Sequence, residues 1–310
     1  MPLLDAIRAL CEMDPPDRLP PCDLGELADV LSAHGLAPLA SYHVENRLVG
    51  AGLPDAFRER LLTVYQGVVN DNLYRVLTLR SVLREAALVP AVVLDGAAYA
   101  DWLYPHLAFR PLGDLRLAVR GEDGARFGEA ASRAGFSLEE TGAAGRTAAF
   151  GDGKIQLSIQ EGLWPGAAAD PGLFERRRPY PAFGPSAARP APEDAVLGVV
   201  AGQALLGLYA PLHTFLDLRQ LLRLEPGLDA GLVRRRADEL GLLRALHGSL
   251  SLLVHFFPDV AGPAALLRPE LTAAERLAVE VVVESARDPA RLRHLRGAEA
   301  AARAVVAPRA

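Results

Sequence analysis

The chain has 310 residues with 33 basic and 38 acidic side chains, and half of it is hydrophobic. This length and apolar content exclude a disordered chain, because they provide enough residues to bury a core. The formal net charge of −5 argues against general nucleic-acid coating and polybasic membrane anchoring, which both need an excess of cations. No apolar run reaches the roughly 20 residues of a membrane-spanning helix, so we expect no membrane partner. Only Cys11 and Cys22 are present, which favours a reducing, cytoplasmic location.

Residues 1–88 are predicted to form an N-terminal helical region. Apolar residues recur at helical spacing before Gly35, and a longer amphipathic stretch follows over 54–88. The pattern changes at Val89, where a short β-branched run bounded by Pro90 and Gly96 indicates a buried strand. A short helix ending at Pro105, an alternating strand over 114–119 and a helix ending at Gly135 are expected next.

A hairpin is predicted around Gly151-Asp152-Gly153, between strands over 146–150 and 154–160, with 136–140 as a further edge strand. Residues 89–163 therefore form a small mixed α/β core. Residues 164–192 are rich in Pro, Gly and Ala and are interpreted as a linker loop. Residues 193–310 return to helical patterns, including an apolar run at 196–208 that indicates a buried helix. The predicted fold class is α+β, a mixed-sheet core flanked by helical regions.

The segment 92–119 carries the clearest indication of a binding site. It is predicted to run strand, Gly96, short helix, loop and then Asp114 at the entrance to a second strand. A glycine at a strand-to-helix turn lets the backbone approach phosphate oxygens, and free N–H groups at a helix start favour anions. Asp114 is expected at the same end of the sheet, where a metal could bridge phosphate and carboxylate.

These residues resemble a known family. The order strand, Gly, helix, Tyr, Arg and Gly-Asp-x-x-Leu-x-Val is similar to the uncharacterised bacterial nucleotidyltransferase family of the DNA polymerase beta-like superfamily. The resemblance covers most of the chain and extends to the Leu216-Asp217-Leu218 element in the C-terminal half. The matching positions of the motif region are Gly96, Ala97, Ala98, Tyr104, Arg110, Gly113, Asp114, Leu117, Val119, Gly135 and Phe136.

The resemblance implies a nucleotidyltransferase fold, with Gly96, Arg110 and Gly113 at the nucleotide and Asp114 as catalytic residue and Mg²⁺ ligand. It also implies two further carboxylates, one two residues after Asp114 and one on a later strand, which together hold two metal ions.

This sequence departs from that pattern at four positions. Arg116 stands at the second carboxylate position, and a guanidinium cannot ligate Mg²⁺. Gln156 and Ser158 stand where the third is expected, and Asp95 replaces the lysine that precedes the turn glycine. Arg116 could pair with Asp114 or Asp95 as an internal cation, and Asp95 could instead supply a relocated carboxylate.

Several other polar residues have a structural and a functional interpretation. His213 and Asp217 lie four apart on a predicted helix, so they could share a metal, although a core histidine bonded to a carboxylate is commoner. His247 and His255 have no partner in a recognised spacing and are expected to pack against helices. The arginine run 176–178 could bind phosphates or RNA, but in a Pro-rich loop a solvated run is commoner.

Two functional hypotheses follow. In the first, the chain is a catalytically degenerate nucleotidyltransferase-fold protein that binds a nucleotide or a protein or peptide partner. In the second, it is an active, Mg²⁺-dependent enzyme that transfers a nucleotide from an NTP to a hydroxyl acceptor. The altered motif positions favour the first. A purely helical scaffold protein would leave the strand–Gly–helix–Asp arrangement unexplained.

Overall fold

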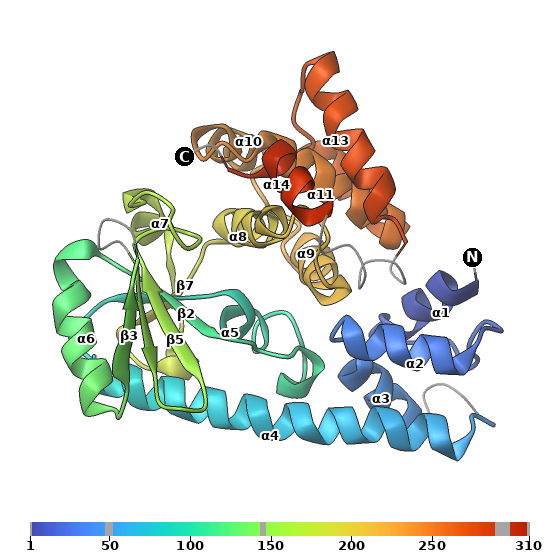
Figure 1. Ribbon diagram of the computed structural model, residues 1–310, viewed down its shortest axis with the longest axis horizontal. Helices are drawn as coiled ribbons and strands as arrows, with labels where there is room; N and C mark the ends of the chain where they lie inside the picture. The colour runs from blue at the N-terminus through green and yellow to red at the C-terminus, as the bar shows by residue number, and fades with distance from the viewer. Residues whose placement is uncertain (1, 47–51, 143–146, 289–297, 309–310) are drawn as a thin grey trace.

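The long helix α4 (Asp55–Glu85) supports both the N-terminal helices and the sheet. The computed structural model describes residues 2–46, 52–142, 147–288 and 298–308. Figure 1 shows α4 along one side of the molecule, with the sheet over its C-terminal half and the N-terminal helices over its N-terminal half. Those helices are α1 (Pro2–Leu10), α2 (Leu24–Ala33) and α3 (Ala37–Glu45). The predicted N-terminal helical region is therefore present.

The sheet has seven strands in the order β3-β4-β5-β2-β1-β7-β6. β2 pairs in parallel with β5, and β1 with β7, while the other neighbours are antiparallel. The predicted hairpin joins β4 to β5 and β3 is an edge strand, as expected, but Arg146 lies outside the described residues. The strands are β1 (Ala91–Leu94), β2 (Leu115–Val119), β3 (Ser137–Thr141), β4 (Thr147–Gly151), β5 (Gln156–Gln160), β6 (Arg178–Pro179) and β7 (Ala187–Arg189).

The two faces of the sheet differ in chemistry because side chains alternate along each strand. Leu115, Leu117 and Leu157 are fully buried. The helix α6 (Gly124–Arg133) lies beside α4 at one end of the sheet and packs with Phe127 buried. The face that carries Asp114, Arg116, Gln156 and Ser158 is called the motif face below. It meets the short helix α5 (Asp95–Tyr99) only near β1 and β2.

The segment 164–192 is more than the linker loop that its composition predicts. It contains the helix α7 (Pro171–Arg176) and both β6 and β7. β7 pairs directly with β1, so this segment completes one side of the sheet. Proline and glycine mark the turns between these short elements. Because these residues dominate the composition, the sequence indicated a loop and not strands.

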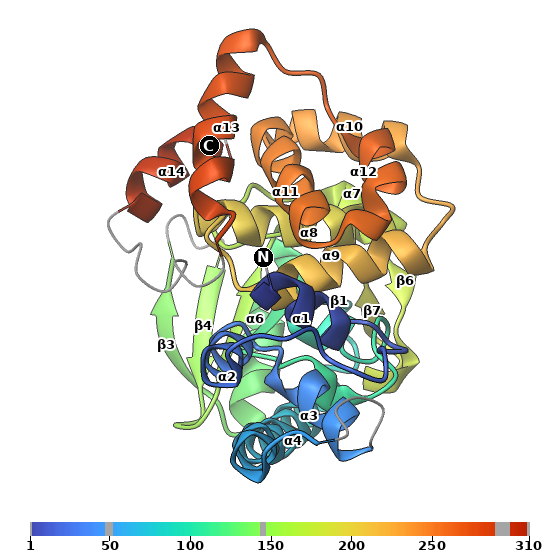
Figure 2. The ribbon, with the colours of Figure 1, turned by 90° about the vertical axis from the view of Figure 1, so that its right-hand side faces the viewer.

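The C-terminal region is helical, as predicted, and Figure 2 shows its helices stacked above the sheet. The apolar run at 196–208 falls mostly in the buried helix α8, which confirms that expectation. Among the described helices, none has the length and apolar character needed to span a membrane. The helices are α8 (Pro192–Leu205), α9 (Leu212–Leu224), α10 (Ala230–Glu239), α11 (Leu243–Phe256), α12 (Ala261–Leu267), α13 (Ala273–Ala286) and α14 (Ala298–Val306).

Arg176, the first residue of the arginine run, is bonded within the protein, whereas Arg178 is exposed as a solvated run predicts. Arg176 donates two hydrogen bonds to Asp194, at 3.0 and 2.9 Å, and the Asp194 side chain is completely buried. Arg236 of α10 adds a second guanidinium to the same carboxylate, at 3.6 Å. A buried carboxylate needs such partners because desolvation penalises its charged form. Arg176 therefore fastens α7 to the C-terminal helices.

Candidate functional site

The candidate site lies where β1 turns into α5 and where β2 begins. Asp95 leaves β1 in the left-handed region, with φ 51°, a conformation that is unusual for a residue other than glycine. Gly113 also has a positive φ of 62°, which sets the turn that brings Asp114 to the entrance of β2. Both turns were expected from the sequence, and they place Asp95 and Asp114 at the same edge of the sheet.

Arg116 is tied to Asp95 rather than to Asp114. Its Nη1 donates to Oδ2 of Asp95 at 3.0 Å, and both side chains are about one third exposed. The cation of Arg116 therefore neutralises the aspartate that begins α5, directly after β1. This confirms one of the two pairings that the sequence left open. A guanidinium has five N–H donors, so Arg116 keeps donors for a further partner.

Arg110 forms a second, buried pair with Asp217 of α9. Its Nε and Nη2 donate to Oδ2 of Asp217 at 3.2 and 2.9 Å, and the hydroxyl of Tyr104 donates to Oδ1 at 2.7 Å. The two charged side chains are 9% and 1% exposed. The remaining guanidinium nitrogen, Nη1, donates to the carbonyl of Pro111. Each of the three guanidinium nitrogens of Arg110 therefore has a partner within the protein.

Gly96 makes room for the Arg110 side chain of this pair and also lines the cavity beside it. A Cβ atom added at Gly96 would lie 2.7 Å from the carbonyl oxygen of Leu112 and against the Arg110 guanidinium. The glycine expected to let a phosphate approach thus lets Arg110 approach. At Gly113, by contrast, an added Cβ would meet nothing within 4 Å. Of the two glycines, Gly113 borders open space.

Asn72 of α4 holds the loop that precedes β2. Its amide nitrogen donates to the carbonyls of Leu107 and Arg110, both at 2.8 Å, and its oxygen accepts from the N–H of Leu112 at 3.1 Å. Sequence reasoning missed this residue. The signal was an asparagine on the buried stripe of a long helix, where only a polar partner could satisfy it.

His213 and Asp217 lie on the same helix but do not bond each other. Nδ1 of His213 lies 3.1 Å from the carbonyl of His34, while Asp217 binds Arg110 and Tyr104. Burial and the neighbouring Arg110 lower the pKa of His213 to about 3, so its ring is neutral. Burial also raises the pKa of Tyr104 well above its usual value, with Asp217 acting in the same direction. The predicted histidine–carboxylate pair is therefore absent.

Gln156 and Ser158 lie beside the motif strand, as their expected role requires. Ser158 pairs in register with Arg116, and the same register continued by two residues sets Gln156 beside Asp114. The strand β5 is thus adjacent to β2, and its side chains at these two positions, Gln156 and Ser158, are neutral. The structure brings all four altered positions to one edge of the sheet.

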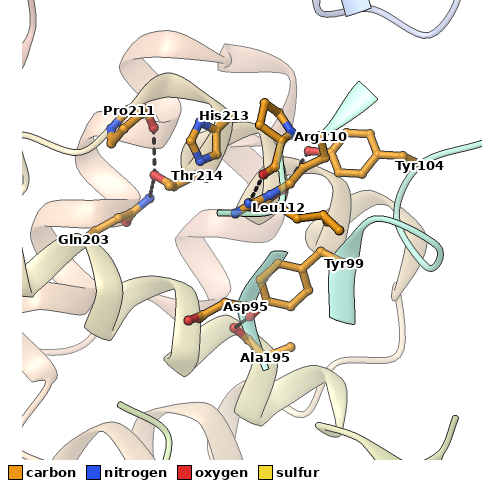
Figure 3. A network of polar contacts seen from close by, with 12 residues as sticks. Asp95, Tyr99, Tyr104, Arg110, Leu112, Ala195, Gln203, Pro211, His213 and Thr214 are labelled. Atoms are coloured by element: carbon orange, nitrogen blue, oxygen red, sulfur yellow. Dashed lines mark hydrogen bonds and ion pairs between the residues drawn. The ribbon is translucent and has the colours of Figure 1, made fainter. Parts of the chain in front are cut away.

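A cavity of about 300 Å³ opens at this edge, between β2, α5 and α8. Its polar side includes Asp95, Gly113, Asp114 and Arg116, and its opposite side is formed largely by small and apolar residues of α8. Figure 3 shows Asp95 and Tyr99 facing Arg110 and His213 across this region. The apolar residues on the α8 side are Gly198, Val199, Gly202, Leu205 and Leu206.

Comparison with known proteins identifies the family. Residues 20–258 match the sequence profile of a family described as "Uncharacterised nucleotidyltransferase". The chain belongs to this family. The match extends from the N-terminal helices through the sheet to α11, so it includes every residue of the cavity. No curated protein and no solved structure matches the chain.

The residues at this edge of the sheet do not fit a site that binds two Mg²⁺ ions. Mg²⁺ prefers several oxygen ligands in near-octahedral geometry. Asp114 offers one carboxylate, while that of Asp95 is already bonded to Arg116. Among the described residues, no group of three or more His, Cys, Asp or Glu side chains is arranged to hold a metal. The donor set therefore does not fit the two-metal site that was expected from the resemblance.

Proposed function

We propose that this nucleotidyltransferase-family protein binds a nucleotide in the cavity between β2, α5 and α8, without magnesium and without nucleotidyl transfer. The observation that carries the proposal is the Arg116–Asp95 pair at 3.0 Å. It places a fixed positive charge where the family pattern calls for a metal ligand. A guanidinium binds phosphate oxygens directly, through parallel N–H donors.

The chemistry of the cavity supports a ligand with one charged and one apolar end. The N–H-rich side chain of Arg116 and the open turn at Gly113 lie on the polar side. On the opposite side, an added Cβ at Gly202 would meet nothing within 4 Å, so a flat ring can approach the α8 backbone. Such a division suits phosphates at the sheet edge and a base against α8.

Arg110 receives a different role from the one first expected. Since Asp217 and Pro111 engage its guanidinium, we assign it to positioning the cavity wall rather than to phosphate contact. Gly96 contributes to the same wall of the cavity. Asp114 is left as a solvent-exposed carboxylate beside the phosphate position, where it opposes rather than assists binding of a metal-free nucleotide.

Calorimetric titration of the full-length protein with ATP, GTP, CTP and UTP, in EDTA and then in excess Mg²⁺, tests the proposal. We expect one nucleotide to bind equally well in both buffers. Arg116→Gln should weaken it about tenfold, since a charge-assisted hydrogen bond contributes roughly 1.5–3 kcal/mol. Arg120→Gln, a change of the same charge outside this cavity, is the matched control.

Two results would contradict the proposal. Binding that needs Mg²⁺ and is lost in Asp114→Ala would indicate a working metal site and revive the active transferase. Binding of no nucleotide in either buffer would favour the protein or peptide partner instead. The cytoplasmic location expected from the cysteine content stays a prediction.

A further inference from the structure

The start of α9 forms a polar wall of the nucleotide cavity that is distinct from the motif face. Figure 3 shows His213 across the cavity from Asp95, the residue that pairs with Arg116. The wall adjoins the end of α8, so in the proposed orientation it meets the base of the nucleotide. The lining residues at this end are Leu205, Leu206, Pro211, His213 and Thr214.

The ring of His213 is fixed with one nitrogen bonded inside the protein. Its Nδ1 lies 3.1 Å from the carbonyl oxygen of His34. Because a carbonyl oxygen can only accept, Nδ1 carries the ring proton. An added Cβ at Gly35 would lie 2.6 Å from Nδ1, so the turn after α2 packs directly against the ring. Burial and Arg110 lower the pKa of His213 to about 3, and the neutral ring has a lone pair on Nε2.

Nε2 of His213 is an acceptor that the protein leaves unused. No residue in the described part of the chain donates a hydrogen bond to it. It also retains accessible surface, in contrast to the two ring nitrogens of His43, which are buried without partners. His213 is partly exposed and lines the cavity. A ligand with an N–H donor can therefore reach Nε2.

Thr214 extends the acceptor character of this wall. Its hydroxyl donates to the carbonyl of Pro211 at 2.9 Å and accepts from Nε2 of Gln203 at 3.1 Å, as Figure 3 shows. A hydroxyl has a single proton, so Thr214 has only a lone pair left for a ligand. The backbone N–H groups of residues 212–214 are bonded to His34 and Pro211. The start of α9 thus presents acceptors to the cavity and no free donor.

Such a wall distinguishes the nucleobases by one substituent. Adenine and cytosine carry an amino group, which donates, where guanine and uracil carry a carbonyl oxygen, which accepts. An amino group can donate to Nε2 of His213. A carbonyl oxygen at the same place would set two acceptors against each other and leave both unpaired, which costs free energy.

We infer that the cavity selects a nucleotide whose base carries this amino group, adenine or cytosine, and that His213 is the residue that recognises it. The inference rests on the proposed function, because it takes the ligand to be a nucleotide. It gives His213 a role as a hydrogen-bond acceptor, in place of the metal ligand or partner of Asp217 that its spacing suggested.

Calorimetric titration of the full-length protein with two pairs of nucleotides, in EDTA, tests this inference. The pairs are ATP with ITP and CTP with UTP, and in each pair a carbonyl oxygen replaces the amino group. We expect the amino-bearing member of at least one pair to bind about tenfold more tightly than its partner, because the carbonyl leaves an acceptor unpaired.

Two variants separate the roles of the ring nitrogens. His213→Asn retains an N–H group near the position of Nδ1 but has no atom at that of Nε2, so it should lose the preference within the pair. His213→Gln places an amide oxygen near the position of Nε2 and should keep part of the preference. His255→Asn makes the same substitution at a histidine outside the cavity and should keep all of it.

The inference is overturned if the parent protein binds a nucleotide without distinguishing the members of either pair, or if His213→Asn keeps the full preference. Binding of no nucleotide would overturn the proposed function and this inference with it, so the two failures differ. Each ratio is measured on one protein, so a general loss of affinity does not imitate a loss of preference. Melting temperatures show whether the variants are folded, and the ratio in the parent protein decides the outcome even where one is unstable.

Discussion

Two arginine–aspartate pairs stand close together in this protein and differ in burial. Arg110 and Asp217 join the core to α9 with side chains 9% and 1% exposed, and Tyr104 completes the network. Arg116 and Asp95 join β2 to the start of α5 with side chains 33% and 29% exposed. Both pairs line the same cavity, the first from its buried side and the second where the side chains are open to solvent.

This difference assigns the two pairs to different tasks. Breaking a buried pair leaves an uncompensated charge in a poorly solvated place, whereas an exposed pair is screened by water and contributes little to stability. The buried pair is therefore structural. The exposed pair can exchange partners at low cost, which is what a ligand-binding arginine requires.

The largest expected effect is that of breaking the buried pair. Asp217→Ala should lower the free energy of unfolding by about 3–5 kcal/mol, because Arg110 is left buried without its carboxylate. Urea unfolding monitored by circular dichroism measures this. Asp95→Asn is the matched control at the exposed pair, with an expected cost below about 1 kcal/mol. Equal costs for both substitutions would contradict the division of roles.

A variant that gains metal binding would test the position of the exposed pair beside the expected metal site. Arg116→Asp combined with Gln156→Glu restores carboxylates beside Asp114, and we expect this variant to bind Mg²⁺ or Mn²⁺. At tenfold the dissociation constant, a metal that binds only the folded state stabilises it by about 1.4 kcal/mol. Thermal unfolding with and without metal measures the shift. No shift would show that the alignment of these positions with the family motif is wrong.

A further expected effect is a dependence of stability on pH near the buried pair. His213 has its pKa lowered to about 3 by burial and by Arg110, so the folded protein keeps it neutral. Below about pH 6.5 the unfolded chain binds a proton that the folded chain does not, and stability falls as pH decreases. The slope is at most about 1.4 kcal/mol per pH unit.

Melting temperatures at pH 7 and pH 5 check this effect. The decrease between the two values should be smaller in His213→Gln than in the parent protein. His43, His247 and His255, whose pKa values burial also lowers, remain in both proteins and cancel in the comparison. An identical decrease would mean that His213 is protonated in the folded state.

The helices and most strands could be predicted from local patterns. The stripe over 54–88, the β-branched run before Asp95 and the glycines around Asp152 each have a periodicity or turn chemistry that few other structures share. The strands β6 and β7 could not, because each has only two or three residues and is held by pairing with a distant strand. Pairing across that distance leaves no mark in the local sequence.

The site was predictable in its position but not in its interactions. The sequence alone placed Gly113 and Asp114 at a strand entrance and identified Arg116 as a departure from the family motif. Its assignment of Gly96 and Arg110 to a nucleotide stays a prediction, and the sequence did not indicate that Arg110 bonds to α9 or that Gly96 gives it room. The partner that decides this, Asp217, lies 107 residues from Arg110, and only tertiary contact relates the two.

The sequence by itself determined most of the helices and strands and the residue types at the positions that resemble the family motif, since each depends on residue type and spacing along the chain. The tertiary structure decided which carboxylate each arginine binds, which glycine borders open space and which face of the sheet stays open. Those features depend on burial and on contacts between segments far apart in the chain. Desolvation makes the Arg110–Asp217 pair a structural element, and solvent access leaves Arg116 available to a ligand.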